Sequence, residues 1–249
     1  MSSENLPVPP TVPFVIGHRG AAGLAPENTL ISLRRARLEG AGWVEFDIML
    51  SADGVPVLFH DDTVNRTTNG KGAVNKLDFA TLRTLDAGAW FSADFAGTRI
   101  PTFAEAIQAL AVEGLGANVE IKPYPGTARE TAEATCRLIN EAWPSSVPPP
   151  VISSFDAEAM AVARDQLGSF ERAMLFGNLP GNWLETVREL DCRAVHASNR
   201  GVTKPMVDAV RDAGLPFRVY TVNDPIRART LRDMGVSSVF TDRPDLIRD

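Results

Sequence analysis

Cysteine is scarce in this chain, with Cys136 and Cys192 as the only two among 249 residues. They form no Cys-x-x-Cys pair, and they lie at no zinc-site spacing from the histidines. A disulfide framework and a zinc finger are therefore not expected. We predict two buried, reduced thiols, which are typical of proteins of the reducing cytoplasm.

Long apolar runs and an excess of basic residues are also missing. No apolar stretch approaches the roughly 18 residues of a membrane span, and the N-terminal MSSENLPVPPTVP has neither the basic start nor the apolar stretch of a signal peptide. The net charge is −6, from 25 basic and 31 acidic residues. With this net charge, the protein as a whole has no positive field that would attract nucleic acid or an anionic membrane. We expect neither as a stable partner, so any anion site must be local.

Short apolar runs alternate with segments of helical period along the chain. The runs expected to be strands are residues 14–18, 43–49, 117–122, 150–155, 171–176, 193–198, 217–223 and 237–242. The segments between them have helical spacing, and Thr102 with Glu105 forms a capping-box pattern before one of them. Counting the short closing segment 242–249, eight strand–helix units predict an α/β fold of the (β/α)8 TIM-barrel class. An open, doubly wound parallel sheet is the alternative.

About fifty residues, 50–101, separate the second expected strand from the next helix, which is too long for a plain βα loop. This segment is rich in Gly, Asp, Asn and Thr, and it contains one strand-like piece, VPVLFH. It also holds an aromatic group formed by Phe79, Trp90, Phe91 and Phe95. We predict a small insertion after the second strand, folded over the mouth of a single barrel domain that spans residues 1–249.

Acidic residues interrupt two of the apolar strands. Because side chains alternate along a strand, Glu45 and Asp47 share one face, opposite an apolar face that would pack on helices. The next strand repeats the pattern with Glu120 and Lys122. Carboxylates crowded in a barrel lumen need protons or a cation. Three of them form an oxygen ligand set that suits a hard divalent ion, Mg2+ or Ca2+, rather than zinc.

The charge balance favours a phosphodiester as the ligand. Three carboxylates, one divalent ion, Arg19 and Lys122 sum to +1, which a phosphodiester neutralises and a phosphate monoester exceeds. A metal-free network of the same five side chains is the alternative, and it leaves one negative charge uncompensated. The residues thus indicate metal-assisted phosphodiester cleavage, with the ion holding phosphoryl oxygens and activating a hydroxyl or a water.

All three histidines fall at or near the ends of expected strands. His18 is followed by Arg19 and by the small residues 20–23, which let backbone and substrate approach closely. His60 is followed by two aspartates, either of which could orient its ring. Two histidines near one site suggest a general acid and a general base. His196 lacks such neighbours, and we expect it to be structural.

The loop after His18 leads into an expected helix over residues 27–40. Pro26 and Glu27 suit the start of a helix, where proline is tolerated and an acidic residue is favoured. Asn28 is expected either to cap this helix or to tie down the loop. For Glu27 and Asn28, a structural role and a role in holding the site are both open.

Taken together, these motifs resemble the glycerophosphodiester phosphodiesterase family. The HRG…PEN, ExD, HD…RTTxG and ExK motifs at these spacings are highly specific as a set. The matching stretches follow one another over nearly the whole chain: HRGAAGLAPENTL (18–30), VEFDIMLSADGVPVLFHDDTVNRTTNGKG (44–72), LDAGAWF through RIPTFAEAI (85–107), VEIK (119–122), ISSF (152–155), YTVND (220–224) and FTDRPD (240–245).

The resemblance implies a barrel with an insertion after the second strand and one divalent cation, Mg2+ or Ca2+. The implied reaction is metal-dependent hydrolysis of small glycerophosphodiesters, such as glycerophosphocholine and glycerophosphoethanolamine, to an alcohol and sn-glycerol 3-phosphate. The implied site residues are the metal ligands Glu45, Asp47 and Glu120, the acid–base pair His18 and His60, and the phosphate-binding Arg19 and Lys122.

Tyr220 departs from the family pattern, since many members carry Trp before Thr-Val-Asn. The aromatic face is kept and a hydroxyl is added, so we expect altered contacts with the glycerol moiety or the leaving group. Water and the glycerol 2-hydroxyl are both open as the nucleophile, and so are the separate roles of the two histidines and the oligomeric state. Two other functions are open: a lysophospholipase D whose acyl chain meets the aromatic residues near Trp90, and a non-catalytic domain that binds phosphate ligands.

Overall fold

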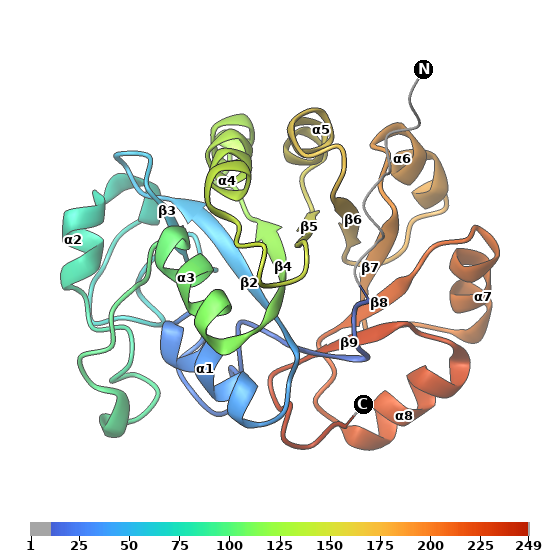
Figure 1. The fold of residues 1–249 in the computed structure, drawn as a ribbon, viewed down its shortest axis with the longest axis horizontal. Coiled ribbons are helices and arrows are strands. Elements are labelled where there is room, and N and C mark those ends of the chain that lie inside the picture. Colours follow the sequence, from blue (N-terminus) through green and yellow to red (C-terminus); the bar gives the residue numbers. More distant parts are fainter. Residues whose placement is uncertain (1–10, 249) are drawn as a thin grey trace.

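A computed structural model describes residues 11–248 of the chain (Figure 1). Within them, eight parallel strands form a ring: β1 (Val15–Gly17), β2 (Trp43–Leu50), β4 (Gly116–Ile121), β5 (Val151–Ser154), β6 (Glu171–Phe176), β7 (Ala194–Ser198), β8 (Phe217–Tyr220) and β9 (Ser238–Thr241). The sheet order β1-β9-β8-β7-β6-β5-β4-β2 is closed by pairing of β1 with β2. The predicted TIM barrel is therefore confirmed, and the open sheet is excluded.

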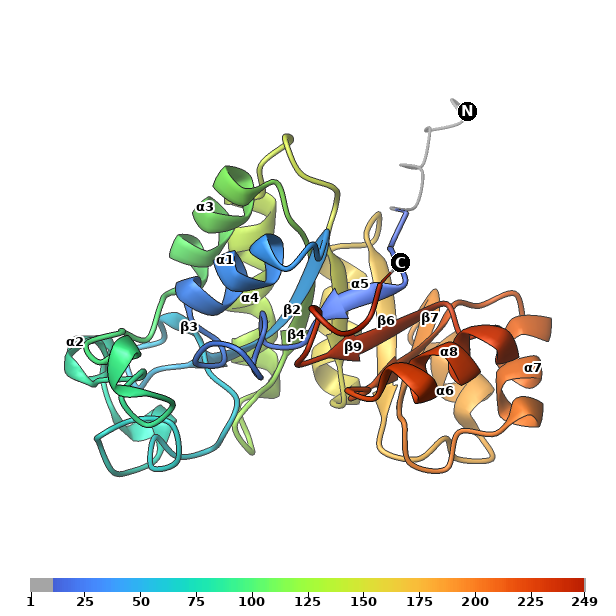
Figure 2. The ribbon, with the colours of Figure 1, turned by 90° about the horizontal axis from the view of Figure 1, so that it is seen from below.

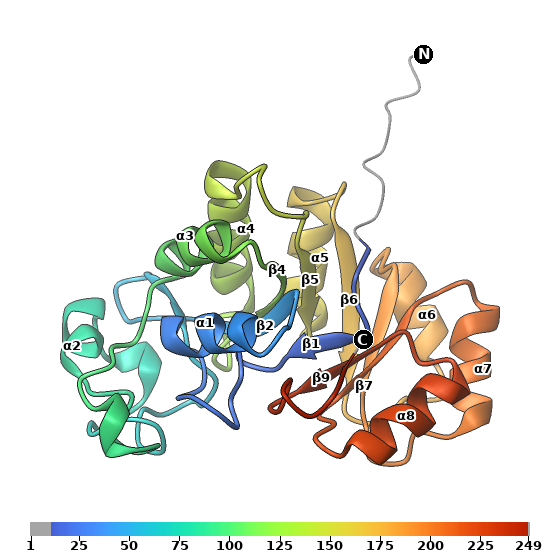
Figure 3. The ribbon, with the colours of Figure 1, turned by 60° about the horizontal axis from the view of Figure 1, so that its bottom comes forward.

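Helices surround the barrel (Figures 2 and 3). They are α1 (Leu30–Leu38), α3 (Phe103–Glu113), α4 (Ala128–Ala142), α5 (Ala157–Gln166), α6 (Trp183–Glu189), α7 (Lys204–Asp212) and α8 (Pro225–Met234). The expectation of a helix at the closing segment is wrong, because residues 242–248 form bends and turns instead. This segment is short and contains a proline, and Leu246 N–H donates to the Arg243 carbonyl at 3.0 Å in a single turn.

The starts of two helices show how local sequence sets the fold. At α3 the predicted capping box is present: Thr102 accepts from the Glu105 N–H, and the Glu105 side chain accepts from the Thr102 N–H. Helix α1 begins later than expected, with Thr29 rather than Pro26 or Glu27 at its N-terminus. The reason is Asn28, whose φ of 55° is left-handed and does not continue a helix.

The alternation along β2 places its two kinds of side chain as expected. Val44, Phe46 and Ile48 are fully buried in the core between the sheet and the helices, and the Phe46 ring lies 6.0 Å from that of Phe103 on α3. The acidic positions of β2 therefore face the lumen. The parallel register sets Asp47 directly beside Glu120 of β4, so the fold itself brings these carboxylates together.

Residues 51–101 form the predicted insertion, which flanks the barrel beside β2 (Figures 1 and 2). Its strand β3 (Pro56–Leu58) pairs antiparallel with the end of β2, and a short helix, α2 (Phe79–Thr84), follows. A separate cluster that includes Val57, Val64 and Leu82 forms its core. The insertion is thus a small packed unit attached to the strand that carries two of the acidic residues.

The four aromatic residues expected to form a group in the insertion do not do so. Phe79 packs against the core of the insertion. Trp90, Phe91 and Phe95 contact one another edge to face, and the Trp90 indole N–H donates to the Ala87 carbonyl. These contacts are those of a local structural cluster.

Two further expectations concern the whole chain. Cys136 and Cys192 are both buried and unpaired, as predicted, and burial raises the pKa of each thiol to about 12. Over residues 11–248, no helix has both the length and the apolar character needed to cross a bilayer.

Candidate active site

A pocket of 170 Å³ lies at the carboxyl ends of the barrel strands. Active sites of TIM barrels occupy this end, where loops from separate strands converge. All eight side chains singled out in the sequence line the pocket: His18, Arg19, Glu45, Asp47, His60, Glu120, Lys122 and Tyr220. They come from β2, β4 and the residue that follows it, β8, the loop after β1 and the insertion, so the fold unites residues more than 200 positions apart.

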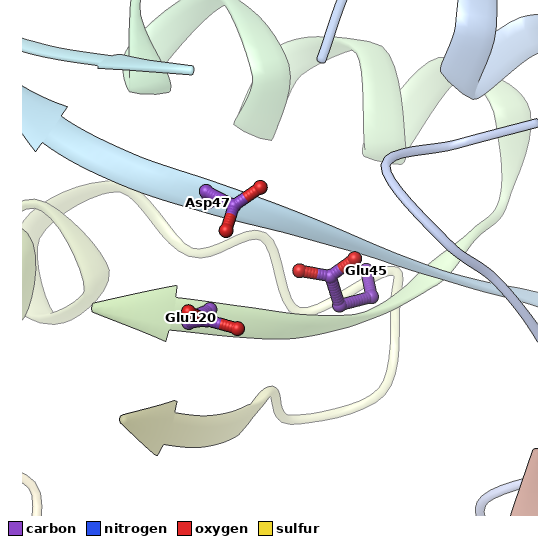
Figure 4. A group of neighbouring side chains, drawn as sticks. All are labelled: Glu45, Asp47 and Glu120. Atoms are coloured by element: carbon purple, nitrogen blue, oxygen red, sulfur yellow. The ribbon is translucent and has the colours of Figure 1, made fainter. Parts of the chain in front are cut away.

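Three acidic side chains form the centre of the pocket. Figure 4 shows Glu45 and Asp47 on β2 beside Glu120 on β4. One carboxylate oxygen from each lies within 4.8 Å of the others, and the residues are only 4%, 2% and 8% exposed. An all-oxygen set of this kind fits a hard divalent cation such as Mg2+ or Ca2+.

The three carboxyl groups have unequal proton affinities. Burial, together with the charges of Asp47 and Glu120, raises the pKa of Glu45 well above its usual range. Burial and then Asp47 raise the pKa of Glu120 to about 8. Burial also raises the pKa of Asp47, but Arg19, His60 and Lys122 outweigh it, so that pKa lies below its usual value. In the metal-free site, protons and a cation therefore compete for Glu45 and Glu120.

Two cationic side chains border the carboxylates. Arg19 Nε lies 3.5 Å from Asp47 Oδ2, and Lys122 Nζ lies 3.8 Å from Asp47 Oδ1 and 3.7 Å from Glu120 Oε1. Glu45 differs, because no Arg or Lys side chain of residues 11–248 lies within 4.0 Å of its carboxylate, which accepts the Arg19 backbone N–H at 2.9 Å. Glu45 is therefore the one member of the trio without an Arg or Lys side chain of the described residues at ion-pair distance.

Each of the two site histidines is held by a carboxylate at Nδ1. His18 Nδ1 lies 2.6 Å from Asp242 Oδ1, and His60 Nδ1 lies 2.6 Å from Asp61 Oδ1. The Nε2 atom of His18 lies 3.9 Å from Glu45 Oε2, on the side of the acidic cluster. Burial lowers the pKa of His60 despite the opposing charge of Asp47, which favours the neutral ring near pH 7.

Several supporting residues were not predicted from the sequence. Asp242 follows β9 directly, and its second oxygen accepts from Asn223 Nδ2 at 2.7 Å. Burial raises the pKa of Asp242, but the hydrogen bond from His18 outweighs it, so Asp242 is ionised at neutral pH. Its position at a strand end, like that of His18, was the available signal. Asn28, whose role the sequence left open, donates to Asp47 Oδ2 at 2.9 Å.

Tyr220 and His196 line other parts of the same pocket. The Tyr220 hydroxyl donates to the Phe176 carbonyl at 2.8 Å, so the added hydroxyl bonds strand β6, on the far side of β7 in the sheet, instead of pointing freely to a ligand. His196 is fully buried, and its Nε2 lies 3.2 Å from Arg218 Nη1. Burial and then Arg218 lower the pKa of His196 well below its usual value, in keeping with the structural role expected for it.

Comparisons with known proteins agree on one relationship. Residues 18–246 match the model of the glycerophosphoryl diester phosphodiesterase family. The chain is 32% identical to a putative glycerophosphodiester phosphodiesterase of Bacillus subtilis, over 94% of this chain and 96% of that one. It also resembles the structure of an Oleispira antarctica phosphodiesterase in complex with the product sn-glycerol-3-phosphate. That match has a TM-score of 0.92 and 38% identity, and it covers 95% of both chains. A glycerophosphodiester phosphodiesterase structure from Agrobacterium tumefaciens matches with a TM-score of 0.77 and 28% identity, over 94% of this chain and 98% of that one.

Proposed function

The chain belongs to the glycerophosphoryl diester phosphodiesterase family and is an enzyme of that class, and we propose that its reaction is metal-dependent hydrolysis of glycerophosphodiesters to an alcohol and sn-glycerol 3-phosphate. The observation that carries the proposal is the buried carboxylate trio bordered by two cations and two histidines. The product bound in the Oleispira relative supports the same substrate class. The two buried, unpaired thiols support a cytoplasmic location.

Glu45, Asp47 and Glu120 are proposed to hold one divalent cation, Mg2+ or Ca2+. Their oxygen donors match the preference of these ions, and no Arg or Lys side chain of the described residues lies within 4.0 Å of the Glu45 carboxylate. When bound, such an ion polarises phosphoryl oxygens and acidifies a coordinated hydroxyl or water. Asn28 fixes Asp47, so this ligand needs little reorganisation on binding.

Arg19 and Lys122 are proposed to bind the phosphodiester anion. Both side chains reach the pocket beside the carboxylates. Burial lowers the pKa of Arg19, but Asp47, Glu27 and Glu45 outweigh it and hold the pKa above its usual value, so Arg19 is permanently charged. A permanent charge held at the edge of a buried site stabilises negative charge that develops on the phosphoryl oxygens in the transition state.

His18 and His60 are proposed to move the protons. One imidazole Nε2 accepts the proton of the attacking hydroxyl as its oxygen forms a bond to phosphorus. The other imidazole protonates the alcohol oxygen as its bond to phosphorus breaks. The carboxylates at Nδ1 support this assignment because they fix each ring and leave Nε2 free for the substrate. The attacking hydroxyl belongs either to water or to the glycerol 2-position; in the second case a cyclic phosphate forms, and a water then opens it to sn-glycerol 3-phosphate.

Substrate choice gives a direct test of the proposed function. We expect glycerophosphocholine and glycerophosphoethanolamine to yield sn-glycerol 3-phosphate, measured with a coupled dehydrogenase assay. Lysophosphatidylcholine should react much more slowly, because Trp90, Phe91 and Phe95 contact one another and do not line the pocket. Faster turnover of the acylated substrate would contradict this. Phosphate binding without turnover of any diester would point to a binding domain instead.

Cation affinity is expected to rise with pH. Glu45 and Glu120 have raised pKa values in the metal-free protein, with Glu120 near 8, so protons compete with the cation below that pH. Each proton released on binding strengthens the apparent affinity about tenfold per pH unit until its carboxyl is ionised. The apparent dissociation constant for Mg2+, measured between pH 6 and pH 9, should fall as the pH rises. A constant value over this range would show that these carboxyls are not ligands.

A further inference from the structure

Arg66, in the insertion, contacts two carboxylates at once. Its Nε and Nη2 atoms donate to Asp61 Oδ2 and Oδ1 at 2.6 and 2.8 Å. Its Nη1 and Nη2 atoms donate to Glu27 Oε2 and Oε1 at 2.7 and 2.8 Å. One planar guanidinium therefore makes two two-pronged contacts, one within the insertion and one with the loop after β1.

Each of these carboxylates also holds a side chain of the pocket. Asp61 Oδ1 lies 2.6 Å from His60 Nδ1, and Glu27 Oε1 accepts from Arg19 Nη1 at 2.7 Å. A continuous series of contacts thus runs from His60 through Asp61, Arg66 and Glu27 to Arg19. Arg66 does not itself line the pocket, so any effect on the reaction must pass through these neighbours.

We propose that Arg66 is a positioning residue, which fixes His60 of the insertion relative to Arg19 of the barrel so that proton transfer and phosphate binding act on one substrate. The inference rests on the function proposed above. His60 and Arg19 lie on separate segments, and Arg66 and Glu27 are 39 positions apart in the chain. The contacts of Arg66 join the insertion to the loop after β1 beside the pocket.

The ionisation of Asp61 explains how this contact reaches the imidazole. Hydrogen bonds from Arg66, ahead of the opposing effect of burial, hold the pKa of Asp61 well below its usual range. An ionised carboxylate only accepts hydrogen bonds, so the close contact requires the proton of His60 to be on Nδ1. In the neutral ring, Nε2 then carries the free lone pair. Arg66 thereby supports both the orientation and the tautomer of His60.

The geometry distinguishes Arg66 from an ordinary surface ion pair. Isolated exposed pairs contribute little, and the Arg66 side chain is 45% exposed. The guanidinium carries a rigid, planar set of N–H donors, which holds the two carboxylates at fixed positions relative to each other. A lysine ammonium does not reproduce this geometry. Arg83 provides a matched control. It lies in the same insertion, is 41% exposed and makes a two-pronged contact with Glu105, but it does not line the pocket or contact a residue of the site.

The test compares Arg66→Met and Arg66→Lys with Arg83→Met and Arg83→Lys, using glycerophosphocholine at a saturating divalent cation concentration. Both Arg66 variants are expected to lower kcat about 10- to 100-fold, as expected for a small misplacement of reacting groups. Both Arg83 variants should keep the wild-type kcat. In an Asp61→Asn background, Arg66→Met should cost no more than about threefold further, because the two changes break the same series of contacts. Equal kcat values for the Arg66 and Arg83 variants would overturn the proposal.

A spectroscopic measurement tests the same proposal without turnover. In ¹⁵N NMR spectra of histidine-labelled protein, His60 should show the Nδ1-protonated tautomer in the wild type and in Arg83→Met. Arg66→Met should give a mixture of tautomers. An unchanged His60 spectrum in Arg66→Met would contradict the positioning role. Absence of product from the wild type would instead refute the proposed function, and the tautomer measurement would still decide the role of Arg66.

Discussion

Replacement of His18 or His60 by alanine is expected to lower kcat for glycerophosphodiester hydrolysis by about 100- to 10,000-fold, the usual contribution of a positioned general acid or base. Neither imidazole belongs to a hydrophobic core cluster, so the loss of kcat in each variant should reflect lost proton transfer more than impaired folding. The measurement is steady-state release of sn-glycerol 3-phosphate by each variant at a saturating cation concentration. Either variant with kcat close to that of the wild type would remove its histidine from the mechanism.

Variants of the supporting aspartates serve as controls for this prediction. Asp242→Asn and Asp61→Asn keep both imidazoles but weaken the contacts of 2.6 Å that orient them. We expect each to lose less kcat than the matching alanine variant. The cation affinity of all four variants should stay near the wild-type value, because none of these four residues belongs to the carboxylate trio.

The second large effect is expected from the carboxylate trio. Glu45→Gln, Asp47→Asn and Glu120→Gln should each reduce turnover on the order of 1,000-fold at cation concentrations that saturate the wild type, since a bound cation contributes several kcal/mol to charge stabilisation. Each amide keeps the shape of the side chain and removes its charge. Turnover near that of the wild type in any one variant would exclude that residue as a ligand.

In the metal-free protein, Glu120→Gln and Asp47→Asn should shift the unfolding midpoint in opposite directions. The pKa of Glu120 is raised in the folded state, so its ionisation destabilises the fold as pH rises from the unfolded value toward about 8. Glu120→Gln removes this cost and should raise the midpoint at pH 8 to 9. The pKa of Asp47 is lowered by Arg19 and its other partners, which outweigh burial, so Asp47→Asn should lower the midpoint at neutral pH. Shifts of the same sign in both variants would contradict this account.

The strand pattern predicted the acidic centre of the site because two simple features of parallel strands, side-chain alternation and register, control it. Alternation along β2 and β4 determines which side chains face the lumen, and the parallel register places Asp47 beside Glu120. The barrel brings the carboxyl ends of its strands together at one end, so His18 and Lys122 also line the pocket there. These placements need no knowledge of loop conformation.

Contacts made by loops lay beyond the reach of such patterns. The pairing of Asp242 with His18 joins residues 224 positions apart, and only the closure of the barrel makes them neighbours. The bridge from Arg66 to Glu27 depends on how the insertion folds back on the barrel. The late start of α1 likewise follows from the left-handed backbone at Asn28, which the helical spacing of the leucines does not reveal.

Titration calorimetry on chelator-treated protein, with Mg2+ and Ca2+ at pH 8, tests the central claim most directly. The expected result is one bound cation per chain in the wild type, loss of that binding in Glu45→Gln, and return of turnover in proportion to occupancy. Full turnover in excess EDTA, or cation binding unchanged in Glu45→Gln, would contradict the account.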